Sequence, residues 1–287
     1  HLGSSRGRLF INERDDGTGA RAESLIYSIA LAAKYDISFG GVYMNRVSLS
    51  HGIKPARIIQ PLLGLDQPGD LFFAAAGEEI EASLQKATFT SVEQMEKTFE
   101  AGFGQICSDM SILLVASCPA CEVDRSLESR NASFLDEYMP PRFLEALASS
   151  STLLQSTPNR FFSKGKLSVA MHMRRGDVDG TNKLNWNRWV PNEWFLKVAE
   201  HIRARFPNAD IHLFTVREGR PFDFHEFEER NITMHVDGEA VSDWAHFSTA
   251  HIMVTTKSSF SHVPGLLNPN CVIYKPFWHP PLSRWTD

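Results

Sequence analysis

The stretch LSVAMHMRRGDV, from Leu167 to Val178, joins an apolar run to an abruptly polar ending. Its apolar part is typical of a buried strand. The run ends in His172, followed two residues later by a pair of arginines, a glycine and an aspartate. Ligands of open parallel sheets bind at the carboxyl ends of strands. The pattern therefore predicts a strand that delivers cationic side chains to a binding edge.

The rest of the second half alternates between strand-like and helix-like segments. Extended patterns occur in KLSVAMHM, ADIHLFTV, ITMHVD, HIMVTT and CVIYKPF. Helical patterns lie between them, and PNEWFLKVAEHIRARF places Trp194, Phe195, Val198 and Ile202 on one face. Strands that alternate with helices in this way are typical of a doubly wound parallel sheet.

The first half shows the same alternation less clearly. RLFINE, ISFGGVYM, DLFFAAA and MSILLVAS predict strands, whereas AESLIYSIALAAKY, SVEQMEKTFEAGF and RFLEALASSSTLL predict helices. We interpret the stretch QSTPNRFFSKG, which is rich in turn-forming residues, as the linker between the halves. The sequence therefore predicts two α/β domains, residues 1–158 and residues 159–287.

Composition argues against some classes of function. The 287-residue chain is 43% hydrophobic and has a formal net charge of -5. Proteins that bind nucleic acid usually carry a basic surplus, so nucleic acid is not an expected partner. No run of about 18 apolar residues occurs, and we expect no membrane span. The compartment stays open between the cytoplasm, slightly favoured, and the lumen of the Golgi or endoplasmic reticulum, if an N-terminal anchor precedes these residues.

The cysteines give no sign of a disulfide framework or a metal site. The chain has four, Cys107, Cys118, Cys121 and Cys271. Zinc would need two further ligands at similar spacing near the Cys118–Cys121 pair, and none occurs there. We expect buried or incidental thiols, although the pattern does not fix the role of that pair. No metal ligands and no cofactor are predicted.

Cationic and hydroxyl-bearing residues follow two of the predicted strands. Arg174 and Arg175 follow the first, and the planar donor fork of each guanidinium matches phosphate oxygens. Alternatively, one of them pairs with an acid such as Asp177 and fastens the loop. A second group lies where HIMVTT meets a helix, a position that favours phosphate binding or ordinary N-capping by serine. A diphosphate between the two groups is the simplest interpretation, and the second group consists of Lys257, Ser258, Ser259, Phe260 and Ser261.

Both groups carry a resemblance to a known family. HMRRGD resembles the His-x-Arg-Arg-type motif of the fucosyltransferase superfamily, which includes the α1,2-, α1,6- and protein O-fucosyltransferases. DGEAVSDWAHFSTAHIMVTTKSSFS is similar to that superfamily's downstream motifs, an acidic segment before a serine-rich turn. The resemblance extends from about Ser168 to Phe277 and is weak before that. It implies a GT-B fold, in which two Rossmann-like domains face each other across a cleft and the C-terminal one holds the nucleotide sugar.

The resemblance also implies roles for individual residues. Arg174 matches the arginine that contacts the donor diphosphate, and Arg175 matches a second, more variable arginine. His172 matches a histidine near the nucleotide. Ser258, Ser259 and Ser261 fall on the phosphate-binding turn. The acid that reads the base or the ribose is Asp237 or Asp243, and the resemblance leaves this choice open.

In the first half, DDGTGARAES lies between a predicted strand and a predicted helix. It looks like the glycine-bearing loop of the family's N-terminal domain, where some members carry a catalytic base just before a glycine. Asp16 precedes Gly17 here and is the candidate base. The alternative is an ordinary set of turn acids, because Asp-Gly is a common turn pair. Arg21 either faces the predicted cleft or pairs with a carboxylate.

Taken together, the resemblance implies an inverting glycosyltransferase that moves L-fucose from GDP-fucose to a hydroxyl of a glycan or glycoprotein. We expect a metal-independent enzyme in which the arginines replace the cation. A UDP-sugar such as UDP-xylose would fit the same arginines. The alternative of another class is a non-enzymatic nucleotide- or glycan-binding module. Tryptophans near the motif are expected to pack rather than to stack on sugar, and these are Trp186, Trp189 and Trp194.

Overall fold

The computed structural model of the chain describes residues 7–12, 16–43, 59, 73–74, 86–100, 111–115, 122, 133–139, 143–151, 161–180, 186–218 and 221–286. Contacts within the chain divide it into two units, His1–Phe143 and Leu144–Asp287. The boundary predicted between residues 158 and 159 falls outside the described residues and stays a prediction. In the described part, no helix is both long and apolar enough to cross a bilayer.

The second unit is built on a five-stranded parallel sheet with the strand order β10-β9-β6-β7-β8. The chain starts in the middle with β6, builds outward to β8, and then returns to place β9 on the other side of β6. Strands β6 and β9 therefore flank the point at which the strand order reverses, which is where open α/β sheets bind ligands. The elements are β6 (Ser168–His172), η2 (Trp186–Arg188), α9 (Asn192–Arg205), β7 (Asp210–Thr215), α10 (His225–Glu228), β8 (Thr233–Val236), α11 (Ala240–Thr249), β9 (Ile252–Val254), α12 (Ser259–Leu267) and β10 (Cys271–Ile273).

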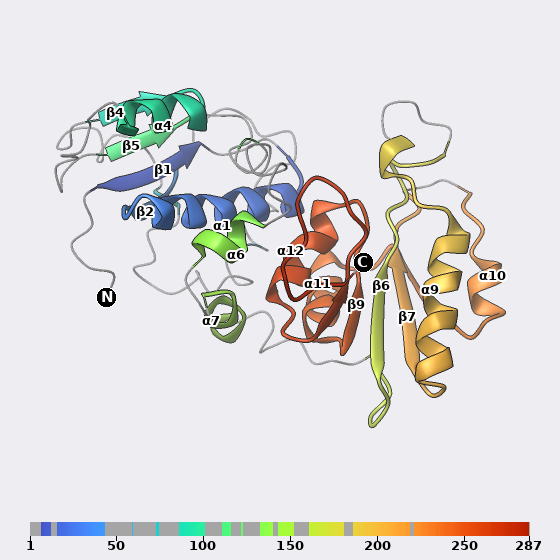
Figure 1. Ribbon diagram of the computed structural model, residues 1–287. Coiled ribbons are helices and arrows are strands. Elements are labelled where there is room, and N and C mark those ends of the chain that lie inside the picture. Colours follow the sequence, from blue (N-terminus) through green and yellow to red (C-terminus); the bar gives the residue numbers. More distant parts are fainter. Residues whose placement is uncertain are drawn as a thin grey trace. The chain divides into compact units, whose positions relative to one another are not determined.

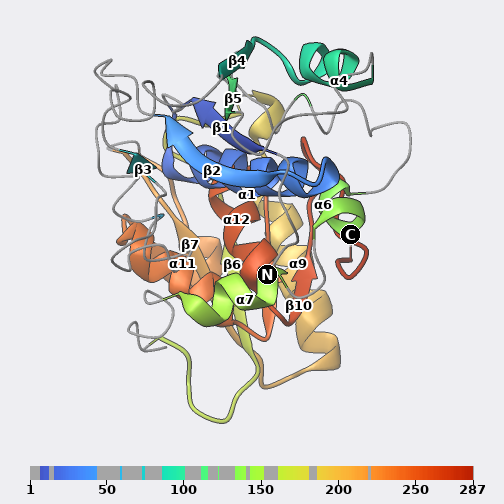
Figure 2. The same ribbon diagram turned by 90° about the vertical axis from the view of Figure 1, so that its left-hand side faces the viewer.

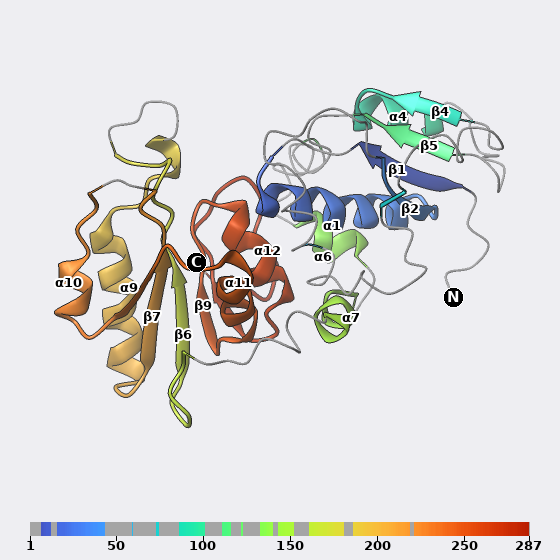
Figure 3. The same ribbon diagram turned by 180° about the vertical axis from the view of Figure 1, so that it is seen from behind.

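Helices cover both faces of this sheet. Figures 1 and 3 show α9 and α10 beside one face, and α11 and α12 beside the other. Every residue of β6 is buried, as expected for a central strand with helices on both sides. Val169 and Met171 of β6 pack with Leu213 of β7 and Phe195 of α9 in the core beneath α9. Because both of its faces are buried, β6 has an almost continuously apolar sequence.

The first unit also contains a five-stranded parallel sheet, in the order β3-β2-β1-β5-β4. Helix α1 runs along this sheet next to β2 and contacts α6 (Figure 2). Two elements of this unit, β4 and α6, were not predicted from the sequence. The elements are β1 (Arg8–Asn12), α1 (Thr18–Lys34), β2 (Ser38–Tyr43), β3 (Phe73–Ala74), β4 (Lys86–Phe89), α4 (Val92–Glu100), β5 (Ser111–Leu114) and α6 (Phe134–Tyr138), with α7 (Phe143–Ser150) beginning at the division between the units.

The predicted α/β fold class is confirmed. Each unit has the parallel sheet and flanking helices of a Rossmann-like domain, and a GT-B fold consists of two such domains. One local expectation needs correction. The stretch DDGTGARAES was predicted as a loop, but α1 begins at Thr18, so Arg21 lies on its first turns. Of the cysteines, Cys271 is a free thiol, and Cys107, Cys118 and Cys121 lie outside the described residues.

Candidate anion-binding site

Arg174 and the start of α12 meet at the switch point of the second sheet. Arg174 follows the end of β6, and Ser258 follows the end of the neighbouring strand β9. Nη1 of Arg174 donates a hydrogen bond of 3.1 Å to Oγ of Ser258. The two groups that the sequence places after separate strands are therefore in direct contact.

The surroundings of the Arg174 guanidinium are only partly balanced in charge. Its Nη2 donates to Oδ2 of Asp177 at 2.7 Å, and the Asp177 side chain is 44% exposed. Its Nε is buried and has no hydrogen-bond partner among the described residues. The cation also lies at the N-terminus of α12, where the helix dipole is itself positive. An anion bound here would relieve this unfavourable pairing.

Burial shifts the pKa values of two neighbouring groups at this edge, and the arginine charges add to the shift of one of them. His172 is buried, and burial first, then the charges of Arg174 and Arg175, lowers its pKa to about 3. The imidazole is therefore neutral at physiological pH, with Nδ1 in a 3.2 Å hydrogen bond to Oγ1 of Thr256. Burial also lowers the pKa of Arg175, to about 10, so this guanidinium remains a cation.

Arg175 turns away from Arg174 and fastens the following loop. Its side chain is 1% exposed, and its guanidinium lies 3.7 Å from the ring centre of Trp189. Nη1 donates to the carbonyl oxygen of Arg174 at 2.9 Å. Nη2 donates to the carbonyl oxygen of Val190 at 2.9 Å and to Oδ1 of Asn192 at 2.6 Å. Arg175 therefore fastens the loop through carbonyl and amide oxygens, with Trp189 packed against it, whereas the predicted alternative of a pair with Asp177 is made by Arg174.

The serine-rich turn before α12 is held by its own hydroxyl groups. Oγ of Ser258 caps the helix by accepting the N–H of Phe260 at 3.3 Å. Oγ of Ser261 accepts the N–H of Thr256 at 3.2 Å and donates to the carbonyl oxygen of Ser258. Ser259 is also buried. The predicted hydroxyl groups thus shape the turn, and Ser258 links it to Arg174.

Lys257 and Phe260 flank this turn. Nζ of Lys257 donates to the carbonyl oxygen of Asn187 at 2.9 Å, which ties η2 to the start of α12. The Phe260 ring packs against His172 and Trp244, with ring centres 5.3 and 5.5 Å apart. Both residues therefore help to fix the position of the edge on which Arg174 lies.

The glycine of the RRGD stretch is favoured by its backbone conformation. Gly176 has a φ of +74°, in the left-handed region. A Cβ at this position would lie 2.6 Å from Cδ of Glu218, so the exposed end of that side chain would have to move aside. The sequence around Glu218 gives no signal that its side chain lies next to Gly176.

The two candidate acids for nucleotide recognition have different environments. Asp237 is exposed at the end of the edge strand β8, where its Oδ1 accepts the N–H of Arg217 at 2.7 Å. Asp243 is 7% exposed on the first turn of α11, the helix that packs against α12. Among the described residues, its carboxyl group has no hydrogen-bond partner. Burial raises the pKa of Asp243 to about 7.

The first-half candidates lie at the start of α1 in the first unit. Gly17 is the N-cap residue of α1, so the helix start has no side-chain capping hydrogen bond. The N–H of Gly17 donates to Oδ1 of Asp16 at 2.7 Å, so this carboxylate shapes the turn itself. Arg21 is buried on α1. The roles of Asp16 as a base and of Gly17 and Arg21 as donor contacts stay predictions, as does the cleft.

No protein-family model and no curated protein matches the sequence. Similar solved structures include POFUT1 in complex with GDP, with 12% identity, 94% of this chain and 98% of that chain covered, and a TM-score of 0.44. They also include E. coli heptosyltransferase WaaC with ADP-2-deoxy-2-fluoro heptose, with 12% identity, coverage of 97% and 92%, and a TM-score of 0.43. The ADP complex of WaaC gives 13% identity with the same coverage and TM-score. Similarity at this level assigns no residue a role.

Proposed function

We propose that the chain is a glycosyltransferase that binds the diphosphate of a nucleotide sugar at Arg174 and the start of α12. The observation that carries this proposal is the Arg174 guanidinium, fixed by Ser258 at the N-terminus of a helix. A cation beside a positive helix end needs negative charge nearby, and Asp177, whose side chain is 44% exposed, supplies a single carboxylate. The site also lies at the sheet's switch point, where nucleotides bind in open α/β folds.

The geometry supports catalysis through stabilisation of the leaving group. Negative charge builds up on the departing nucleotide diphosphate as the bond to the sugar breaks. Arg174 is held in place by Ser258 and Asp177 before the donor arrives, and preorganised donors of this kind stabilise developing charge. The incoming phosphate would exchange with Asp177 for the Nη2 donor. In this mechanism the guanidinium takes the part that a divalent cation has in metal-dependent transferases.

Asp243 is the better candidate for reading the base or the ribose. It is buried on the helix that packs against α12, and its oxygens are available to accept N–H or O–H groups. Asp237 is instead engaged with Arg217 at the edge of the sheet, two strands away from β6. GDP-fucose is the donor that the family resemblance implies, with inversion at the anomeric carbon and Asp16 as candidate base.

A screen of nucleotide sugars without acceptor tests the proposal. GDP- and UDP-sugars are compared for thermal stabilisation of the full chain and for slow release of free nucleoside diphosphate. We expect one base to be preferred, and both signals to be lost in Arg174→Ala but kept in Arg205→Ala, which removes an exposed arginine of α9. Saturable binding without release, with any acceptor offered, would instead identify a non-enzymatic binding module.

A further inference from the structure

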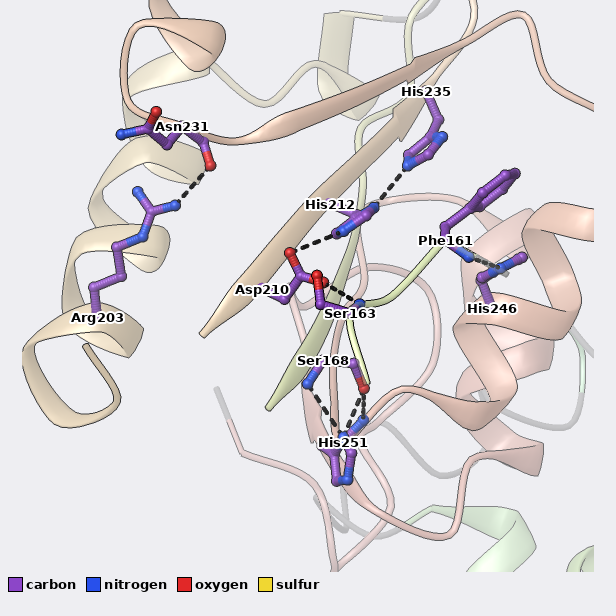
Figure 4. Close-up of polar contacts among 10 residues, drawn as sticks. All are labelled: Phe161, Ser163, Ser168, Arg203, Asp210, His212, Asn231, His235, His246 and His251. Carbon is purple, nitrogen blue, oxygen red and sulfur yellow. Dashed lines mark hydrogen bonds and ion pairs between the residues drawn. The ribbon is translucent and has the colours of Figure 1, made fainter. Parts of the chain in front are cut away.

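Three histidines lie together in the second unit (Figure 4). We call them the histidine face: His212 on β7, His235 on β8 and His246 on α11. Nδ1 of His212 and Nε2 of His235 share a hydrogen bond of 2.8 Å. Nε2 of His212 lies 3.2 Å from Oδ1 of Asp210. His246 completes the group with Nδ1 at 2.6 Å from the carbonyl oxygen of Ser242.

A short segment, Phe161–Ser163, lies against the histidine face, and we call it the strap. The ring of Phe161 is stacked between His235 and His246, with ring centres 4.4 and 4.2 Å away. The backbone N–H of Phe161 donates to Nε2 of His246 at 3.4 Å. The N–H of Ser163 donates to Oδ2 of Asp210 at 2.6 Å. The ring of Phe162 packs edge-on against His212, with ring centres 4.9 Å apart. Two backbone donors and two rings thus hold the strap just before the chain turns into β6.

The backbone contact of the strap with His246 requires a neutral imidazole ring, and the contact between His212 and His235 cannot accommodate a second proton on both rings. His246 accepts the Phe161 N–H at Nε2, so its single proton must be on Nδ1, where it faces the carbonyl oxygen of Ser242. His212 donates from Nε2 to Asp210, so its Nδ1 accepts a hydrogen bond from the N–H at Nε2 of His235. A second proton on His246 would remove the acceptor for the Phe161 N–H. A second proton on each of His212 and His235 would place two N–H donors, at Nδ1 of His212 and Nε2 of His235, against each other.

We propose that the strap is an acid-released clasp, in which neutral His235 and His246 hold Phe161 and protonation of the histidine face frees residues Phe161–Ser163. One proton on His212 is tolerated, because Asp210 can balance it and His235 can change tautomer. Further protonation places like charges next to each other, and it converts an acceptor into a donor at the strap backbone. The attraction of an imidazolium for the Phe161 ring opposes release.

The balance of these effects favours the neutral rings. Burial, followed by the influence of His212 and His246, lowers the pKa of His235 to about 4. Burial also lowers the pKa of His246, against its hydrogen bond to Ser242. It lowers the pKa of His212 as well, although Asp210 acts in the opposite direction.

Other titratable groups surround the clasp. His172, at the end of β6, occupies the position paired with Phe214, whose ring packs on His235. His251 is hydrogen-bonded to Ser168 at the start of β6. Ser168 is the residue of β6 that pairs with Asp210 of β7. Lys164 is exposed in the turn after the strap. Asp210 is the carboxylate that contacts the strap directly, so acidification adds positive charge that this single anion does not offset.

The sign of the pH dependence follows from these shifts. A released His235 would titrate near the ordinary histidine value of about 6.5. The released state therefore binds more protons than the clasped state as pH falls below about 6.5, and this excess lasts down to about pH 4. Each proton taken up only on release changes the opening equilibrium about tenfold per pH unit. At about pH 5 we expect the strap to open at least about tenfold more often than at about pH 7.5.

Amide hydrogen exchange of the full chain, resolved to single residues by NMR, tests the clasp. Protection factors corrected for intrinsic rates are compared at about pH 7.5 and about pH 5. We expect protection of the Phe161 and Ser163 amides to fall at least about tenfold at the lower pH. Protection of the Val169 and Met171 amides in β6 should change much less. Equal protection of the strap at both values, or a loss shared with β6, would overturn the proposal.

Two variants assign the response to the histidines. His235→Gln keeps a donor near the Nε2 position but does not titrate, so it should reduce the acid response of the strap. His225→Gln, which removes an exposed histidine of α10, should leave the response unchanged. A His235→Gln chain that responds like wild type, or a His225→Gln chain that does not respond, would contradict the assignment. The wild-type measurement stands independently should either variant fold poorly.

Discussion

Two regions of the second unit differ in the charge of their side chains. One lies at the carboxyl ends of β6 and β9, and the other is the histidine face. The first region holds the guanidinium groups of Arg174 and Arg175, and Arg174 lies beside a helix N-terminus. The second holds His212, His235 and His246, which burial keeps neutral. Fixed charge suits recognition of an anion at any physiological pH, whereas neutral rings with lowered pKa values respond to acid.

The two adjacent arginines, Arg174 and Arg175, also differ in their surroundings. Arg174 contacts the turn before α12 and is partly exposed, whereas Arg175 is enclosed by Trp189 and carbonyl groups. Identical side chains at consecutive positions thus have different surroundings, because successive residues after a strand point in different directions. We expect one to act on ligand binding and the other on the stability of the loop.

Substitution of Arg174 should have the largest effect. Arg174→Ala removes the preorganised donor at the proposed diphosphate site, and loss of one such donor typically costs about 10²–10³ in rate. Turnover of the preferred donor is the measurement, with far-ultraviolet circular dichroism to show that the fold is kept. Arg205→Ala is the matched control and should retain full activity. Near-normal turnover in Arg174→Ala would show that the arginine region, like the histidine face, takes no part in donor turnover.

Arg175→Ala should act mainly on stability. The change leaves the carbonyl oxygen of Val190 and the side chain of Asn192 without their donor in a buried setting. We expect the free energy of unfolding to fall by about 2–3 kcal/mol in denaturant titrations. Activity per folded molecule should fall less than in Arg174→Ala. An Arg175→Ala chain of normal stability but without donor binding would show that Arg175 is itself a ligand.

The neutral histidine of the arginine edge should be visible in the pH dependence of stability. The pKa of His172 is lowered to about 3, so the unfolded chain binds its proton first as pH falls below about 6.5. Stability contributed by the neutral ring is therefore lost between about pH 6.5 and about pH 3. His172→Asn should reduce the slope of unfolding free energy against pH by about 1.4 kcal/mol per unit there. An unchanged slope would mean that His172 is charged in the folded protein.

Ser258→Ala should give the smallest effect of this set. Loss of the cap on α12 typically costs about 1 kcal/mol of stability, and Arg174 loses its 3.1 Å acceptor. We expect a measurable weakening of donor binding in calorimetric titrations. Ser133→Ala, which removes the cap of α6, should cost similar stability without affecting binding. Equal binding by both serine variants would show that Ser258 does not position Arg174.

Much of the second unit could be predicted from the sequence, because its strands are apolar runs with strong turn or helix signals between them. The first unit was less readable. Strand β4 is the short segment KATF, and α6 has only five residues, too few for a helical period to appear. The extension of α1 to Thr18 was also missed, since glycine and threonine are weak helix formers there.

The candidate site was predictable where residues directly follow strands, as Arg174 and Ser258 do. The partners of Arg175 were not, because Trp189 and Asn192 reach it through a loop whose path local sequence does not specify. The histidine face had no sequence signal either. His212, His235 and His246 come from three separate elements, and only the pairing of β7 with β8 and the packing of α11 bring them together.

A structure of the full chain with a nucleoside diphosphate bound tests the central claim most directly. We predict phosphate oxygens within about 3 Å of the Arg174 guanidinium and of N–H groups at the start of α12. Asp177 should have released Nη2 of Arg174 to the phosphate. A diphosphate bound elsewhere, with the Arg174–Asp177 pair intact, would contradict the account.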